Sequence, residues 1–167
     1  LTTQEALIED DSRIVLDLWH LLDGADIVIA HNGNSFDIPK INTRFIKHGL
    51  PPTTPYQQID TLLVARKQFG FSSNKLDALA TFFGLQGKNH TEFELWTQCL
   101  NGNPDALDIM EEYNREDVRL LEEIYLILRP WIKGHPNVGL YIESDKTVCS
   151  NCGSEVAPVD NKFYYTT

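Results

Sequence analysis

Basic residues are scarce in this chain, and long apolar runs are absent from it. Only 14 Lys and Arg stand against 24 Asp and Glu, which gives a net charge of -10. This balance argues against a protein held on nucleic acid mainly by a basic face, although acidic side chains can recruit cations that then meet phosphates. No apolar run approaches the roughly 20 residues that span a bilayer, and no signal-peptide pattern opens the chain. We therefore expect a soluble protein that has no membrane partner.

Cysteine is also scarce, and the three cysteines form no disulfide framework, which favours a reducing cytoplasm. Cys99 lies in a helical, apolar-rich stretch, where a buried and inert thiol is expected. Cys149 and Cys152 form a Cys-x-x-Cys pair followed by Gly153, a usual spacing for two thiolates on one tetrahedral zinc ion. The sequence has no second pair, so it predicts half of a zinc site. A redox dithiol is the rival interpretation, but no thioredoxin-like strand precedes the pair.

The 167 residues fit one domain with a proper core. A branched apolar run at residues 26–31 predicts a strand that is buried on both faces. The three prolines of residues 50–56 predict a loop, and residues 59–69 a short strand or turn that enters a helix. Apolar spacing, caps and glycine stops predict further helices at residues 12–22, 39–48, 74–83, 92–100 and 104–131, the third capped by Asn74 and the last with a bend near Asn114.

Asp37 is the first candidate for a functional carboxylate. It follows the predicted strand and an Asn/Gly turn, and it begins a helix, where a carboxylate is also a routine cap. Its neighbours favour a functional site: Phe36 can form a wall for a base or sugar, and Asn32 can hold a turn or a phosphate.

Tyr113 and Asp117 are the second candidate pair. Four residues apart in an amphipathic helix, they share one face at roughly 5–6 Å between Cβ atoms. An acid in line with an apolar stripe costs free energy unless it is paired or binds a metal. The structural alternatives are a salt bridge from Asp117 to Arg115 or Arg119, and a core role for Tyr113.

These segments resemble the DEDD superfamily of 3′–5′ exonucleases, in its tyrosine-containing (DEDDy) branch of phage and prokaryotic type. Residues 32–37, Asn-Gly-Asn-Ser-Phe-Asp, are similar to its second motif, and Tyr113-x-x-x-Asp117 is similar to its third. Residues 60–62, 76–80 and 96–102 also resemble members of this superfamily. The resemblance covers about residues 12–132 and implies an α/β, ribonuclease-H-like fold.

The resemblance implies hydrolysis of phosphodiester bonds at a single-stranded 3′ end, with DNA as the favoured substrate and RNA as the alternative, because no motif here reports contacts to the 2′-position. Two Mg²⁺ or Mn²⁺ ions, about 3.5–4 Å apart, would activate water and stabilise the leaving oxygen. Asp37 and Asp117 would be their ligands, and Tyr113 would orient the attacking water, since a phenol of pKa about 10 is a poor base. Asn32 and Phe36 would contact the substrate. The tail resembles the first half of a phage-type zinc ribbon, with Cys149 and Cys152 as zinc ligands.

The chain departs from the family because the first motif, Asp-x-Glu on an opening strand, is absent. We expect the chain to be a piece of a longer protein whose N-terminal strands carry that motif, and this piece alone to be inactive. Residues 1–134 would be the exonuclease domain and residues 135–167 the start of the zinc-ribbon tail. A non-catalytic nucleic-acid-binding module is the alternative, and a helical regulatory domain is a remote third reading. Asp60 would be either a helix cap or a carboxylate that supports the site.

Overall fold

The computed structural model describes residues 1–85, 93–141, 147–150 and 155–156. The elements in chain order are α1 (Thr3–Leu7), α2 (Ser12–Asp23), β1 (Ile27–Ala30), α3 (Asp37–Lys47), β2 (Gln57–Asp60), α4 (Thr61–Gln68), α5 (Leu76–Phe83), α6 (Phe93–Leu100), α7 (Pro104–Leu128) and the 3₁₀ turns η1 (Arg129–Trp131) and η2 (Val138–Leu140).

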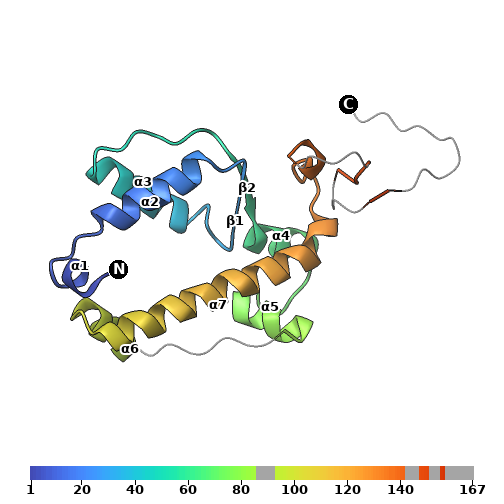
Figure 1. Cartoon of the computed structure of the whole chain (residues 1–167). Helices are drawn as coiled ribbons and strands as arrows, with labels where there is room; N and C mark the ends of the chain where they lie inside the picture. Colours follow the sequence, from blue (N-terminus) through green and yellow to red (C-terminus); the bar gives the residue numbers. More distant parts are fainter. Residues whose placement is uncertain (86–92, 142–146, 151–154, 157–167) are drawn as a thin grey trace, which may run out of the picture.

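The architecture is mostly helical, with one small parallel sheet. β1 and β2 pair so that Ile27 lies opposite Gln57 and Ala30 opposite Asp60. Figure 1 shows α2 and α3 side by side on one side of the sheet, while the long helix α7 crosses the molecule and carries α4, α5 and α6 against it. α1 packs on α6 near the start of α7. The sheet therefore lies between the α2–α3 pair and the helices around α7.

Helix α7 follows from local signals at its start. Asn103 caps the helix by accepting from the backbone N–H of Asp105 and Ala106, and Pro104 occupies its first turn, where no N–H is needed. The bend expected near Asn114 does not break the helix, which is continuous over 25 residues. The Asn114 side chain donates instead to the carbonyl of Met110 one turn earlier.

The main core lies where α7 meets α4 and α5. Its fully enclosed side chains are Ala65, Leu79, Ala80, Leu120, Ile124 and Leu128. The α7 members recur every four residues, so one stripe of the helix faces α4 and α5. A second cluster, around Val15, Leu22 and Phe45, joins α2 to α3.

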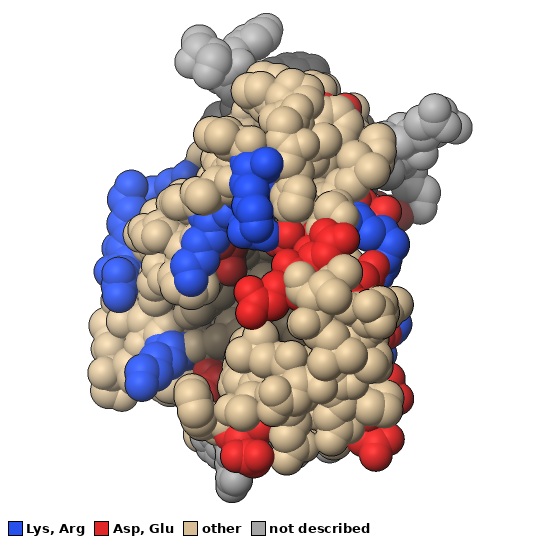
Figure 2. All heavy atoms as spheres, turned by 90° about the vertical axis from the view of Figure 1, so that its left-hand side faces the viewer, with Lys and Arg blue, Asp and Glu red and all other residues tan. Residues whose placement is uncertain are grey.

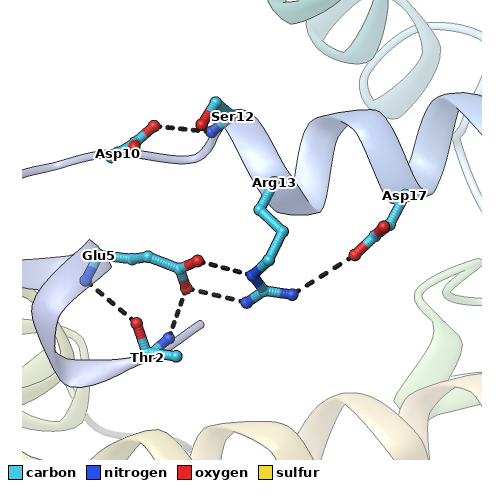
Figure 3. A network of polar contacts seen from close by, with 6 residues as sticks. All are labelled: Thr2, Glu5, Asp10, Ser12, Arg13 and Asp17. Atoms are coloured by element: carbon cyan, nitrogen blue, oxygen red, sulfur yellow. Dashed lines mark hydrogen bonds and ion pairs between the residues drawn. The ribbon is translucent and has the colours of Figure 1, made fainter.

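A short helix that the predicted elements lack, α1, opens the chain. Thr2 and Glu5 form a capping box, in which the Thr2 hydroxyl accepts from the Glu5 N–H and the Glu5 carboxylate accepts from the Thr2 N–H (Figure 3). Arg13 of α2 donates to both Glu5 oxygens and to Asp17. Its guanidinium lowers the pKa of Glu5 to about 2. The network ties α1 to α2.

A second ion-pair cluster joins the start of α2 to the end of α3. Asp11 accepts two hydrogen bonds from the Arg44 guanidinium and one from His48 Nε2 at 2.7 Å. The Arg44 guanidinium lowers the pKa of Asp11 to about 2. Asp11 occupies the cap position of α2, but its side chain makes no capping hydrogen bond because it is held by α3.

Two sequence expectations about the fold are wrong. All four residues of β1 are half-buried rather than buried on both faces, because the described sheet has only two strands and cannot enclose either face. Helix α5 starts after Lys75 rather than at an Asn74 cap. The carbonyl of Asn74 lies 3.0 Å from a ring nitrogen of His31, which holds this loop against β1.

The chain beyond Gly134 begins by packing on α7. His135 is buried, and its Nε2 accepts from the Tyr125 hydroxyl at 2.8 Å while its Nδ1–H donates to the Pro136 carbonyl. The expected division into residues 1–134 and 135–167 stays a prediction. Across the described residues, no helix combines the length and apolar character needed to cross a membrane.

Replacing Ile124 tests the main core. Its side chain is 0% exposed, so Ile124→Ala leaves a cavity and should lower the free energy of unfolding by about 2–5 kcal/mol. Urea unfolding followed by circular dichroism measures the change. Leu126, on the same helix but 52% exposed, is the matched control, and Leu126→Ala should change stability by about 0.5 kcal/mol or less. Equal losses in the two variants would contradict the assignment of the core stripe.

Candidate functional site

The turn between β1 and α3 is held by the buried carboxylate of Asp60, at the end of β2. Asp60 Oδ1 accepts from the backbone N–H of Asn32 at 2.9 Å, and its Oδ2 accepts from the N–H of Asn34 at 3.2 Å. The same carboxylate caps α4 by accepting from Leu62 and Leu63. One side chain thus fixes the turn to the neighbouring strand and helix, which positions the residues that follow the turn.

Two successive residues of the turn, Asn32 and Gly33, accept few other amino acids because of backbone conformation or lack of space. Asn32 has φ 68°, in the left-handed region that asparagine tolerates better than most residues. Gly33 is buried, and a Cβ there would lie 2.3 Å from the Cβ of Ala30, closer than any side chain can approach. The same Cβ would lie 3.8 Å from Oδ2 of Asp37, so the absence of a side chain leaves space beside that carboxylate.

Asp37 is the first residue of α3 and is exposed. Its carboxylate has no ion pair among the described residues. Phe36 precedes it as a half-exposed ring, with Nζ of Lys40 3.9 Å from the ring centroid. The turn therefore presents an aromatic face, an ammonium group and a carboxylate next to one another.

His31 connects this turn to the loop before α5. Its Nε2 lies 3.0 Å from the Asn74 carbonyl, and its Nδ1 lies 2.9 Å from the Thr61 hydroxyl. A carbonyl can only accept, so Nε2 carries the proton. The Thr61 hydroxyl has a single hydrogen, which can go either to Nδ1 of the neutral ring or to the Ala30 carbonyl at 3.1 Å. Burial lowers the pKa of His31 below its usual 6.5, which favours the neutral ring. His31 is therefore a structural histidine with a partner at each ring nitrogen.

Tyr113 and Asp117 lie on α7, and both are half-buried. The neighbouring arginines are engaged by other acids: Arg115 donates to Glu111 at 2.6 Å, and Arg119 donates to Glu112 at 3.2 Å. Arg115 and Arg119 therefore pair with Glu111 and Glu112 on the same helix.

The two halves of the expected site lie on helices whose main packing partners differ. α3 packs on α2, whereas α7 packs mainly on α4, α5 and α6. In the described ranges, no group of three or more His, Cys, Asp or Glu side chains is placed to hold a metal ion. A shared metal site of Asp37 and Asp117, with Tyr113 beside it, therefore stays a prediction, as do the substrate contacts of Asn32 and Phe36.

A hollow of about 650 Å³ lies between α1, the start of α2 and the α6–α7 pair. Its lining includes Asn114, next to Tyr113, and a set of acids: Glu5, Glu9, Asp10, Asp11, Asp108 and Glu111. Figure 2 shows Asp and Glu gathered at a hollow on this face, with Lys and Arg beside them. Its one lining cation, Arg44, is bound to Asp11. The face beside the third motif is acidic.

The predicted zinc half-site lies partly outside the described residues, because residues 151–154, which include Cys152, are not among them. Cys149 is a free, half-buried thiol. Val148, next to Cys149, pairs with Glu155 in an antiparallel bridge. Zinc binding stays a prediction. Cys99 is half-buried rather than buried, and its thiol donates to the carbonyl of Ala106.

Some structural residues were missed by sequence reasoning. The capping box of Thr2 and Glu5 was readable in the sequence as Thr-x-x-Glu. The contacts of Asp11 with Arg44 and His48 join residues more than 30 positions apart, and no local signal marks them.

Comparison with known proteins assigns the chain to a family. The model of the RNase H superfamily (RNase_H_2) matches residues 3–129, which is most of the chain. The chain belongs to the RNase H superfamily. None of the solved structures compared with it matches.

This RNase H superfamily chain is also similar to part of a large polymerase. It is 39% identical over 70 residues to the DNA polymerase III PolC-type of Ureaplasma parvum, a match that covers 42% of the chain. The match spans only 5% of that protein. The mostly helical architecture with its parallel strand pair is consistent with part of an RNase H-like α/β fold.

Gly33 provides a test of the turn in this RNase H superfamily chain. Gly33→Ala places a Cβ against Ala30, so we expect the free energy of unfolding to fall by about 1–3 kcal/mol. Gly70, whose added Cβ meets nothing within 4 Å, is the matched control. Gly70→Ala should be neutral or stabilise by up to about 1 kcal/mol. Denaturant unfolding of both variants measures the difference, and a harmless Gly33→Ala would show that the turn is less tightly packed.

His31 predicts a pH dependence of stability. Its folded pKa lies below the 6.5 of the unfolded chain, so the unfolded state binds more protons between the two values. The free energy of unfolding should therefore be fully maintained above about pH 6.5 and fall as the pH drops below it. Asp11 and Glu5, with pKa values of about 2, lose their contribution only at lower pH. Unfolding curves at about pH 5 and about pH 8 should differ less in His31→Gln than in the unchanged chain, and an equal difference would contradict the assignment.

Proposed function

We propose that the chain contributes Asp37, Asp117 and Tyr113 to a metal-dependent 3′–5′ exonuclease site of the DEDDy type, acting on nucleic acid and on DNA in particular. The observation that carries the proposal is the turn before α3. A buried carboxylate, Asp60, holds its backbone, while the carboxylate of Asp37 is left exposed and without an ion pair among the described residues. A purely structural acid would be expected to make the contacts that Asp60 makes.

The donor chemistry of this site fits Mg²⁺ or Mn²⁺. Both metals prefer oxygen ligands, and carboxylates such as Asp37 and Asp117 supply them. A side chain at position 33 would lie against Oδ2 of Asp37, with its Cβ 3.8 Å away, and glycine keeps that side of the carboxylate clear. Two carboxylates about 4 Å apart repel by about 4 kcal/mol at an effective dielectric of about 20, so such a pair favours bound cations. The bound ions would activate water and stabilise the leaving oxygen of a phosphodiester.

The protein groups would then bind and orient the reactants. Tyr113 would hold the attacking water through its hydroxyl, and Phe36 would offer its exposed ring to the terminal base or sugar. Lys40, 3.9 Å from the centre of that ring, would stand near the phosphate of the same nucleotide. Asn32 would act through the backbone of the turn that Asp60 fixes.

The comparisons support nucleic acid as the substrate. The RNase H superfamily match covers both motifs, and the relative in Ureaplasma parvum is named a DNA polymerase, which favours DNA. A 3′–5′ exonuclease is a natural accessory to DNA synthesis. We further propose that Cys149 and Cys152 are two ligands of a zinc ion, since their Cys-x-x-Cys spacing suits two thiolates on one tetrahedral zinc ion.

The alternative function is a nucleic-acid-binding module without catalysis. It is favoured by the lack, across the described residues, of any group of three or more metal-ligating side chains. A two-metal site needs further oxygen ligands beyond Asp37 and Asp117. Cleavage and metal binding therefore have to be measured separately.

The test uses the natural protein that contains this chain, with Mg²⁺ or Mn²⁺ and single-stranded DNA labelled at its 5′ end. We expect stepwise shortening from the 3′ end. Asp37→Asn and Asp117→Asn should each lower the rate at least about 100-fold, since a ligand of the reacting ions is lost. Tyr113→Phe should slow it about 10-fold or more while Mn²⁺ binding, measured by calorimetry, is kept.

Matched acids elsewhere serve as controls for these variants. Glu122 lies on α7 and is exposed, and Asp26 is an exposed acid beside β1. Glu122→Gln and Asp26→Asn should leave both the cleavage rate and Mn²⁺ binding unchanged. Cleavage that persists in Asp37→Asn and Asp117→Asn would rule out the site. Tight DNA binding without any cleavage by the unchanged protein would favour the binding module.

A further inference from the structure

A row of aromatic rings runs along the loop after α4 and onto α5 and η1. Trp131 contacts Phe69 edge to face, Phe69 stacks on Phe71, and Phe71 meets Phe82, with centroid distances of 5.5, 5.0 and 5.0 Å. The row ends in rings that are largely in solvent, since Trp131 is 60% and Phe82 is 70% exposed. These four residues are here called the aromatic row. Large exposed rings in contact with one another are typical of a binding surface rather than of a core.

An open depression of about 670 Å³ follows the aromatic row. Its walls combine Phe69, Phe71 and Phe82 with the hydroxyl groups of Ser72, Ser73 and Thr81. No Asp or Glu of the described residues lines it. Such a surface offers ring faces and neutral hydrogen-bonding groups to a flat, polar ring system such as a nucleobase.

A second, smaller groove of about 350 Å³ adjoins the row. Its lining includes Lys67 and Lys133, the amide side chains of Gln57, Gln58 and Gln68, and Asn34 of the turn between β1 and α3. The same chain segments border both features, because Gln68 precedes Phe69 and Trp131 precedes Ile132 and Lys133. The groove is here called the lysine groove. Among the described residues its one carboxylate is Asp60, whose oxygens already accept hydrogen bonds from backbone N–H groups.

The acidic hollow beside α1 and the lysine groove differ in charge, and the lysine groove suits an anionic ligand. Among the described residues, Arg13, Arg44, Arg115 and Arg119 are bound to acids, whereas Lys67 and Lys133 have no ion pair. Arg66 and Lys75, near the row in sequence, have none either. The hollow is lined by six acids, whereas the lysine groove is lined by residues of β2, α4 and the segment after η1. Figure 1 shows β2 and α4 towards the opposite end of α7 from α1 and α6. In a chain of net charge -10, unpaired lysines collected in one groove favour phosphate.

We propose that the lysine groove and the aromatic row together bind single-stranded nucleic acid, the groove through phosphates and the row through stacked bases. Paired bases are stacked on each other and cannot lie on aromatic side chains, so the ring faces select single strands. Asn34 belongs both to the groove and to the turn before Asp37, so the bound strand leads from the site turn towards Trp131. The identity of the ligand rests on the proposed function, but binding here needs neither metal nor cleavage.

The test is fluorescence anisotropy of a labelled single-stranded oligothymidine with the whole chain, in EDTA so that no cleavage occurs. We expect Phe82→Ala and Phe82→Leu each to weaken binding at least about fivefold, because both remove a stacking face and the second keeps apolar volume. The double variant Lys67→Ala/Lys133→Ala should lower the slope of log K against log salt by about 0.7 per lysine. Trp131 fluorescence should be quenched on binding, an effect that Trp131→Leu removes.

Matched controls lie on other parts of the surface. Phe93 of α6 is 86% exposed and Lys47 of α3 is exposed, and neither lines the row or the groove. Phe93→Ala and Lys47→Ala should bind the strand like the unchanged chain. A duplex hairpin of equal charge should bind more weakly than the single strand.

Three results would overturn the proposal: no binding of the single strand, binding unchanged by the Phe82 and lysine variants, or equal competition by heparin, which carries charge but no bases. These outcomes are separable from a failure of the proposed function. If the natural protein cleaves DNA and these variants do not change the rate, the proposed nuclease stands and the proposed binding surface is wrong. If the chain binds the strand through its bases, the variants abolish binding and no condition gives cleavage, the proposed binding surface stands and the proposed nuclease is wrong.

Discussion

The carboxylate of Asp60 is the interaction on which the candidate site depends. Four backbone N–H groups, from Asn32, Asn34, Leu62 and Leu63, donate to its two oxygens. Buried polar groups are costly unless they are hydrogen-bonded, and this arrangement satisfies donors from the turn and the start of α4 at once. Because the turn cannot shift without losing these bonds, Asp37 begins α3 at a defined place. This small region thus contains a buried carboxylate, Asp60, which holds the backbone, and a solvent-exposed one, Asp37.

The distribution of charge divides the described surface into an acidic region and a region with unpaired lysines. Acids gather at the hollow beside α1 and α7, where Arg44 is neutralised by Asp11. Unpaired lysines line the groove beside β2 and η1, next to exposed aromatic rings. A net charge of -10 hides this separation because it sums the two regions. The acidic total therefore excludes a broad basic face without excluding local contacts to phosphate, which act over about a Debye length.

Much of the local structure could be read from the chain. Pro39 and Gly49 mark the beginning and end of α3, Gly84 ends α5 in a left-handed conformation, and Pro104 opens α7. These signals succeed because each acts through its own backbone. The errors arise where the packing of segments far apart in the sequence decides the outcome. Asn74 lies in a loop that contacts His31, 43 positions away, and α5 begins only after Lys75. β1 is not enclosed because the described sheet has only two strands.

The sequence by itself determined most of the elements after α1, the two motifs that carry Asp37 and the Tyr113–Asp117 pair, and the family to which they point. It did so because turn chemistry, helical spacing and motif residues are local properties. Only the tertiary structure decided that Asp60 is an anchor rather than an open carboxylate, that Arg115 and Arg119 bind Glu111 and Glu112, and that Trp131 joins the rings after α4. Burial and hydrogen-bond partners depend on which segments pack together in space, and a side chain's neighbours there are set by the whole fold.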